Sequence, residues 1–186
     1  MLRITGGSAK GRSIKLPTGD VRPAMARARI SLFDYLADQV VGARVIDLYC
    51  GSGSLGFEAL SRNSKSVDFV DNSGTVLKVT KSNALKLGFE NRCRFTKTDV
   101  FQFLDKYDVE YNKPYDIIFA APPYKIAEPD EIISRLHRAK ALRISGILCL
   151  EYPKYGTAPS SDNFTLDRRK SYGATVLEVW DYTPTA

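Results

Sequence analysis

The residues of this chain best suited to chemistry are Pro122, Pro123 and Tyr124, which follow an apolar run over residues 115–121. Because neither proline has an N–H and both fix φ, the run cannot continue as a sheet strand past Ala121. We therefore predict that backbone carbonyls and a tyrosine ring project from the carboxyl end of a strand, where open α/β sheets bind ligands. Such an aromatic, carbonyl-rich lip suits group transfer to a planar nitrogen base.

A second candidate site lies upstream, in the glycine-rich turn over residues 51–56, which follows the apolar segment 44–49. The turn reads Gly-Ser-Gly-Ser-Leu-Gly and matches the GxGxxG pattern of dinucleotide-binding enzymes. Asp71 follows Gly51 by 20 residues, at the position where such enzymes place a ribose-binding carboxylate. A nicotinamide or flavin oxidoreductase is therefore one interpretation of the turn.

The carboxylates near the turn favour a different cofactor. Asp47 lies four residues before the first glycine, where its charge would repel a pyrophosphate but attract the sulfonium or ammonium group of S-adenosylmethionine. Asp99 ends the third expected strand and could bind the exocyclic amine of adenine. Acids at three successive strand ends, Asp47, Asp71 and Asp99, predict a site for a cationic nucleoside. The length of 186 residues favours the same interpretation, because it leaves an oxidoreductase little material for a substrate domain.

The elements that must position these residues alternate between strand and helix from Ala43 onward, which predicts right-handed crossovers and a mostly parallel sheet. The expected strands are 44–49, 66–70, 93–96, 116–120 and 147–151. The expected helices are 55–61, 74–87, 100–105 and 128–142, the last stopped by Gly146. Segments 164–169 and 175–182 flank a short turn and predict a closing antiparallel hairpin.

The N-terminal part is expected to form an arm on the same domain. Residues 2–16 alternate loosely between glycine breaks and predict a small β-hairpin, and residues 24–40 repeat apolar side chains at helical spacing after Pro23. We see no linker or repeat. We therefore expect one domain over 1–186, with the arm at 1–41 and a Rossmann-like core at 42–186.

The charge of the chain is concentrated in this arm. Residues 1–29 hold seven basic residues and one acidic residue, so their excess equals the whole net charge of +6. Such a local surplus creates an anion-attracting surface and predicts a nucleic-acid partner. The residues expected to bind the substrate are Arg3, Lys10, Arg12, Arg22, Arg27, Arg29 and Lys125.

The remaining composition indicates an ordinary globular domain, with 44% hydrophobic residues. The cysteines Cys50, Cys93 and Cys149 are at no metal-binding spacing and are expected to be small buried side chains in a reducing cytoplasm. His137 is expected on the surface of a charged helix. No run reaches the roughly 18 apolar residues of a membrane span, so we expect a cytoplasmic protein. We also expect it to be a monomer.

The lip and the cofactor turn together predict methylation of an exocyclic amine. That amine is a poor nucleophile because its lone pair is delocalised into the ring. Acceptors that bind its N–H groups stabilise the positive charge that develops on nitrogen, and a stacked aromatic ring holds the flipped base. A side-chain acceptor, a proline carbonyl and Tyr124 are the groups that this reaction requires.

The chain resembles the RsmD-type 16S rRNA guanine-N2 methyltransferases. The resemblance covers nearly the whole chain and is carried by Asp47–Gly53, by Pro122–Tyr124, and by the helix that begins Arg22-Pro23 and continues through Arg29 and Leu32-Phe33. It implies a class I methyltransferase fold with a seven-stranded sheet, S-adenosyl-L-methionine as cofactor, and 16S rRNA or a small-subunit assembly particle as partner. The expected cofactor-binding residues are Asp47, Tyr49, Gly51, Gly53, Leu55, Asp71, Asn72, Asp99 and Val100.

Two positions depart from the pattern of that family. The lip of the family reads Asp or Asn, Pro, Pro, then Tyr or Phe, and here Ala121 replaces the acceptor; Ala24 replaces a threonine in the arm. Losing one preorganised polar contact typically lowers a rate by about 10²–10³. We expect a weakened enzyme in which the carbonyls of Ala121 and Pro122 bind the amine and Ala121→Asp raises the rate. The alternatives are a catalytically impaired RNA-binding relative and a DNA or other nucleic-acid amino-methyltransferase.

Overall fold

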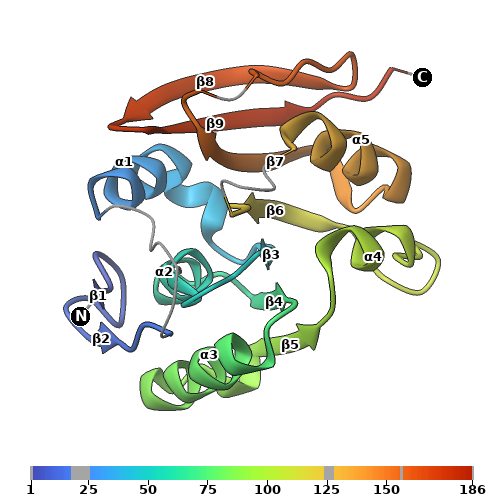
Figure 1. The fold of residues 1–186 in the computed structure, drawn as a ribbon. Helices are drawn as coiled ribbons and strands as arrows, with labels where there is room; N and C mark the ends of the chain where they lie inside the picture. Colours follow the sequence, from blue (N-terminus) through green and yellow to red (C-terminus); the bar gives the residue numbers. More distant parts are fainter. Residues whose placement is uncertain (1, 18–25, 124–127, 156, 186) are drawn as a thin grey trace.

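The computed structural model describes residues 2–17, 26–123, 128–155 and 157–185 (Figure 1). Within them a seven-stranded sheet has the order β5-β4-β3-β6-β7-β9-β8. All neighbouring strands are parallel except β9, which is antiparallel to β7 and β8. This is the Rossmann-like sheet with a C-terminal antiparallel hairpin that the sequence predicted.

The strands that carry the candidate site are β3 (Arg44–Leu48), β4 (Ser66–Asp71), β5 (Cys93–Lys97), β6 (Tyr115–Ala120) and β7 (Leu142–Pro153). The hairpin is formed by β8 (Phe164–Tyr172) and β9 (Thr175–Tyr182). The central strands β3 and β6 are buried along nearly their whole length, which explains why they are apolar without alternation.

Helices cover both faces of the sheet (Figure 1). One core cluster joins the sheet to α1 (Ala26–Leu36), α2 (Ser54–Ser61) and α3 (Gly74–Leu87). The cluster on the opposite face joins it to α4 (Val100–Asp105) and α5 (Pro129–Ala139). The short 3-10 helices η1 (Ala37–Val40) and η2 (Glu90–Arg92) lead into β3 and β5. The parallel strands therefore end at one common edge between the two helical layers.

The N-terminal arm packs on the helical layer of α1, α2 and α3. Its hairpin consists of β1 (Leu2–Arg3) and β2 (Ser13–Ile14), and it buries Ile4 and Ile14. Glu58 of α2 is fully buried and accepts hydrogen bonds from the Thr5 backbone N–H at 2.9 Å and from the Thr5 hydroxyl at 2.7 Å. A buried carboxylate therefore fastens the arm to the core.

Two expected boundaries were wrong. The helix predicted over 128–142 ends at Ala139, because Lys140 adopts a left-handed conformation with φ 48°. Strand β7 then begins at Leu142 rather than 147, and Gly146 lies inside it at an irregularity in its pairing with β6. Pairing with the neighbouring strand, which the local sequence does not encode, extends β7 in this way.

The structure also shows the environments of the cysteines and of His137. Cys50 and Cys149 are buried, Cys93 is half-buried, and all three are free thiols. His137 is half-buried rather than fully exposed, and its Nδ1 lies 3.0 Å from the Tyr182 hydroxyl. In the described part of the chain, no helix has the length and apolar character needed to cross a bilayer.

Candidate functional site

The glycine-rich turn after β3 requires left-handed backbone conformations, which glycine adopts without strain. Tyr49, Gly51 and Gly53 all have positive φ, at 57°, 53° and 76°. Gly53 could not carry a side chain, since a Cβ there would lie 2.6 Å from the ring of Phe57. Gly56 serves helix–sheet packing, because its Cβ would lie 2.3 Å from the ring of Phe69. The turn can therefore pass close under a ligand at the carboxyl edge of the sheet.

Asp47 is a buried carboxylate directly below this turn. Its side chain is 2% exposed, and its Oδ2 accepts a hydrogen bond from the Gly56 N–H at 2.9 Å. Burial raises the pKa of Asp47 to about 8; the Gly56 N–H opposes this effect, and the charge of Asp71 adds to it. A cation bound nearby would stabilise the ionised form of this carboxylate.

Asp71, at the end of β4, ties the turn to the neighbouring strand. Its Oδ2 accepts from the Gly51 N–H at 3.1 Å and its Oδ1 accepts from the Ser73 N–H at 2.9 Å. Each carboxylate oxygen has a second acceptor site available beyond these contacts. Asp71 therefore combines a structural role with the capacity to bind a ligand hydroxyl.

Asp99 lies just beyond the end of β5, near enough to the Tyr49 hydroxyl for its charge to act on it. It caps α4, with Oδ1 accepting from the N–H groups of Phe101 at 2.9 Å and Gln102 at 3.1 Å. Burial raises the pKa of the Tyr49 hydroxyl, and the nearby charges of Asp99 and Glu128 raise it further. The structure thus places the predicted acids at or just beyond the ends of β3, β4 and β5, and two of them, Asp47 and Asp71, contact the glycine-rich turn.

The other predicted cofactor residues differ in accessibility. Asn72 is exposed beside Asp71. The side chains of Leu55 and Val100 are buried, so a contact from either to a ligand would come from its backbone. The sequence did not indicate which of these side chains would be exposed and which would be buried.

The lip follows β6 as expected, since the strand ends at Ala120. Ala121 is half-buried, Pro122 is buried and Pro123 is exposed. The predicted positions Tyr124 and Lys125 lie outside the described residues. The proline carbonyls and Ala121 therefore occupy the same sheet edge as the glycine-rich turn.

The predicted substrate-binding arginines of the arm separate into different roles. The guanidinium of Arg3 donates to the Gly11 carbonyl at 2.8 Å, and that of Arg12 donates to the carbonyls of Lys86 and of Leu87, where α3 ends. Lys10 and Arg27 are exposed, whereas Arg22 and the substituted Ala24 lie outside the described residues.

The prediction that Arg29 binds the substrate was wrong. It is 1% exposed, lies 4.0 Å from the carboxylate of Glu58, and donates to the Arg3 carbonyl at 2.9 Å. Because a phosphate could not reach it in this position, Arg29 supports the packing of the arm rather than contacting a substrate. Its pKa is lowered by burial, and the nearby charge of Glu58 opposes that effect.

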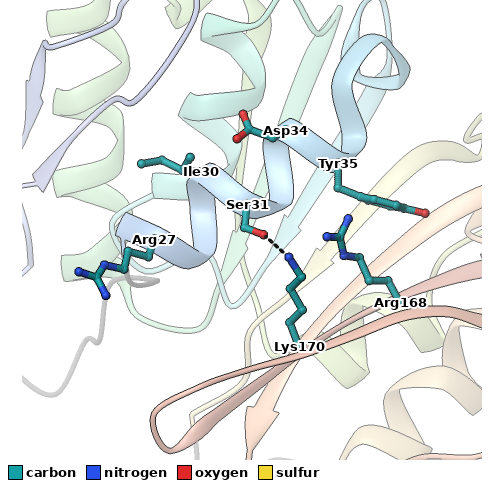
Figure 2. A pocket seen from close by; sticks show the side chains of 7 residues that line it. All are labelled: Arg27, Ile30, Ser31, Asp34, Tyr35, Arg168 and Lys170. Carbon is teal, nitrogen blue, oxygen red and sulfur yellow. Dashed lines mark hydrogen bonds between the residues drawn. The ribbon is translucent and has the colours of Figure 1, made fainter.

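Arg27 instead belongs to a basic hollow between α1 and β8, which we call the α1–β8 groove (Figure 2). The groove has a volume of about 450 Å³ and is lined by Arg27, Ile30, Ser31, Asp34, Tyr35, Arg168 and Lys170. Lys170 donates to the Ser31 hydroxyl at 3.2 Å, and the guanidinium of Arg168 lies 4.7 Å from the ring centre of Tyr35. Three cations and one acid give the groove a positive charge.

Sequence reasoning missed the two β8 residues of this groove. Arg168 and Lys170 are separated by Arg169, whose side chain lies on the other face and donates to Glu178. The alternation of a strand predicts that Arg168 and Lys170 share a face. It does not predict that α1, far away in sequence, lies opposite them.

Comparison with known proteins identifies the family of this chain. A family model described as Conserved hypothetical protein 95 matches residues 2–181. The Ribosomal RNA small subunit methyltransferase D of Haemophilus influenzae is 30% identical over 183 residues, which cover 96% of this chain and 93% of that protein. A solved structure of a candidate methyltransferase from Escherichia coli is 28% identical with a TM-score of 0.88, covering 99% of each chain.

A more distant structure shares the fold alone. The RNA methyltransferase of Salinibacter ruber, solved with S-adenosyl-L-homocysteine, is 14% identical with a TM-score of 0.66. The alignment covers 89% of this chain and 95% of that one.

Proposed function

The chain belongs to the RsmD-type family described as Conserved hypothetical protein 95, and from this membership we propose that it transfers a methyl group from S-adenosylmethionine to the exocyclic N2 of a guanine in 16S rRNA. The observation that carries the proposal is the row of acids at the ends of the adjacent strands β3, β4 and β5, at the same sheet edge as the Pro122–Pro123 lip. That juxtaposition suits a cationic nucleoside donor beside a nitrogen acceptor.

The residues present fit this cofactor. S-adenosylmethionine supplies an electrophilic methyl group on a positively charged sulfur. Asp47, whose pKa is raised to about 8 by burial, gains stabilisation in its ionised form from a nearby cation. Asp71 holds the turn and offers acceptor sites for ribose hydroxyls, and Asp99 offers one for the adenine amine.

The substrate assignment rests on charge and on the named relatives. The relatives named for small-subunit rRNA methylation align with nearly the whole chain. The α1–β8 groove adds Arg27, Arg168 and Lys170 to the exposed Lys10 of the arm as cations for RNA phosphates. We further propose that the protein acts in the cytoplasm as a monomer. Its substrate is then either free rRNA or an assembling small subunit.

The direct experiment incubates the protein with S-adenosylmethionine and either naked 16S rRNA or small-subunit particles, followed by mass spectrometry of the nucleosides. We expect N2-methylguanosine. The absence of any methylated nucleoside, with cofactor binding intact, would support the second candidate, an RNA-binding relative that has lost catalysis. The observation that favours this second candidate is Ala121, which removes the usual acceptor of the lip.

A separate experiment tests whether RNA binds in the α1–β8 groove. The double change Arg168→Ala with Lys170→Ala should weaken binding to single-stranded rRNA fragments and lower the slope of log affinity against log salt by about 1.4. The control, Lys65→Ala with Arg94→Ala, removes the same charge from exposed positions away from the groove. Equal losses in both double variants would show that the groove has no special role.

A further inference from the structure

Glu151, which lies near the end of β7, is a carboxylate to which the sequence pattern assigns no role. Its position follows from the pairing of β6 with β7, in which Phe119 faces Cys149 and Ala120 faces Leu150. One residue beyond this last pair are Ala121, where the chain leaves the sheet, and Glu151, which is still paired with Leu177 of β9. Neighbouring strands lie about 4.8 Å apart, so a side chain at either position serves the same small volume.

Glu151 and Ala121 also share a face of the sheet. Phe119 and Cys149 belong to the core cluster on the side of α1, whereas Ala120 and Leu150 belong to the cluster on the opposite side. Because side chains alternate along a strand, residue 151 returns to the α1 side, and residue 121 does so as the chain leaves the sheet. A carboxylate at 151 therefore faces the side that an acceptor at 121 would face.

The surroundings of Glu151 differ from those of the other interior glutamates. Glu58 and Glu178 are fully buried and accept several hydrogen bonds from protein groups. Glu151 is half-buried, and no described residue donates a hydrogen bond to it or pairs with its charge. Burial alone raises its pKa to about 7. A carboxylate that has no donor among residues 2–17, 26–123, 128–155 and 157–185, at the edge where ligands bind, can accept a hydrogen bond from a substrate.

We propose that the Glu151 carboxylate accepts a hydrogen bond from the exocyclic amine of the target base, and so replaces the acceptor that Ala121 lacks. The proposal rests on the proposed methyl transfer and names a further catalytic residue for it. As the nitrogen lone pair forms the new N–C bond, the broken S–C bond leaves its electron pair on sulfur. The proton lost from nitrogen passes through Glu151 to water. The carboxylate thereby stabilises the charge that develops on nitrogen.

The first test is a mutant cycle measured as single-turnover methyl transfer to rRNA. Glu151→Ala should lower the rate about 10²–10³-fold without changing the affinity for S-adenosylhomocysteine. Ala121→Asp should recover most of that loss in the Glu151→Ala background. In the wild-type background it should add much less, because an acceptor is already present. The control is Asp181→Ala, a partly buried acid at the opposite end of the sheet, paired with Ile147.

The second test reads binding rather than turnover. The target guanine, once mapped, is replaced by hypoxanthine, which lacks the amine, and the affinity of both RNAs is measured with S-adenosylhomocysteine present. The wild type should prefer the guanine RNA about tenfold, as expected for one hydrogen bond to a charged group. Glu151→Ala should bind both RNAs equally.

The outcomes separate the two proposals. Wild-type methyl transfer with an unchanged rate in Glu151→Ala, or a rate lost in Glu151→Ala that Ala121→Asp does not recover, would overturn the role of Glu151 while leaving the function in place. Failure of the wild type to methylate RNA would overturn the proposed function. In that case the role of Glu151, which rests on that function, would be overturned with it.

Discussion

The change Asp47→Asn tests whether ionisation of the buried carboxylate under the glycine-rich turn lowers the free energy of unfolding. Asparagine has nearly the same shape and can still accept the hydrogen bond from the Gly56 N–H, so the packing should be preserved. The pKa of Asp47 is raised by burial from 3.8 to about 8. Between these two values the folded protein binds a proton that the unfolded chain has released, so the free energy of unfolding must fall as the pH rises.

The magnitude follows from linkage. Each pH unit inside this window changes the contribution of Asp47 by about 1.36 kcal/mol, which gives about 2.7 kcal/mol between pH 5 and pH 7. Glu151, whose pKa is raised to about 7, acts in the same direction, so the wild-type curve alone cannot isolate Asp47. Subtracting the free energy of unfolding of Asp47→Asn from that of the wild type removes the contribution of Glu151, which both proteins share. This difference should fall by about 2.7 kcal/mol between pH 5 and pH 7.

The assay is urea unfolding at several pH values without cofactor. The exposed Asp162→Asn serves as the control and should follow the wild-type curve. Parallel curves for wild type and Asp47→Asn from pH 5 to pH 7 would refute the reasoning. A functional consequence can be measured in the same range: binding of S-adenosylmethionine near pH 7 should release a proton, detected by calorimetry in buffers of different ionisation enthalpy, and Asp47→Asn should not release it.

Two further predictions concern the scaffold of the site. Glu58→Gln should lower the free energy of unfolding by about 3–5 kcal/mol, because it removes the charge beside the buried Arg29; denaturant unfolding measures this, and a wild-type midpoint would contradict it. Gly56→Ala should lower the free energy of unfolding by about 1–3 kcal/mol, because the new methyl group meets the ring of Phe69. A thermal midpoint equal to that of wild type would show that the helix can move away from the sheet.

Much of the fold could be predicted from the sequence because its central strands are buried on both faces. Such strands are largely apolar, and β3, β4 and β6 begin and end within a residue or two of their predicted bounds. The bounds of the more exposed edge strand β5 agree equally well. The acids at their ends could be predicted for the same reason, since parallel strands bring their carboxyl ends to one edge.

The rest depends on contacts between segments far apart in the chain. Arg29 lies four residues before Phe33 on the face of α1 that packs on the core, so its spacing indicated burial although its charge indicated a surface role. The α1–β8 groove requires knowing that β8 passes beside α1. The position of Glu151 requires the register of β6 against β7, which single-strand patterns do not specify.

The central claim is that Asp47, Asp71 and Asp99 form a site for S-adenosylmethionine. The most direct measurement is calorimetric titration of the wild type and Asp71→Ala with S-adenosylmethionine, S-adenosylhomocysteine and NAD. We predict that both adenosyl ligands bind the wild type and that NAD does not. Asp71→Ala should weaken both adenosyl ligands at least about tenfold, because it removes the ribose contact and the hydrogen bond that holds the Gly51 N–H. Binding of NAD in preference to the adenosyl ligands, or adenosyl binding unchanged by Asp71→Ala, would contradict the account.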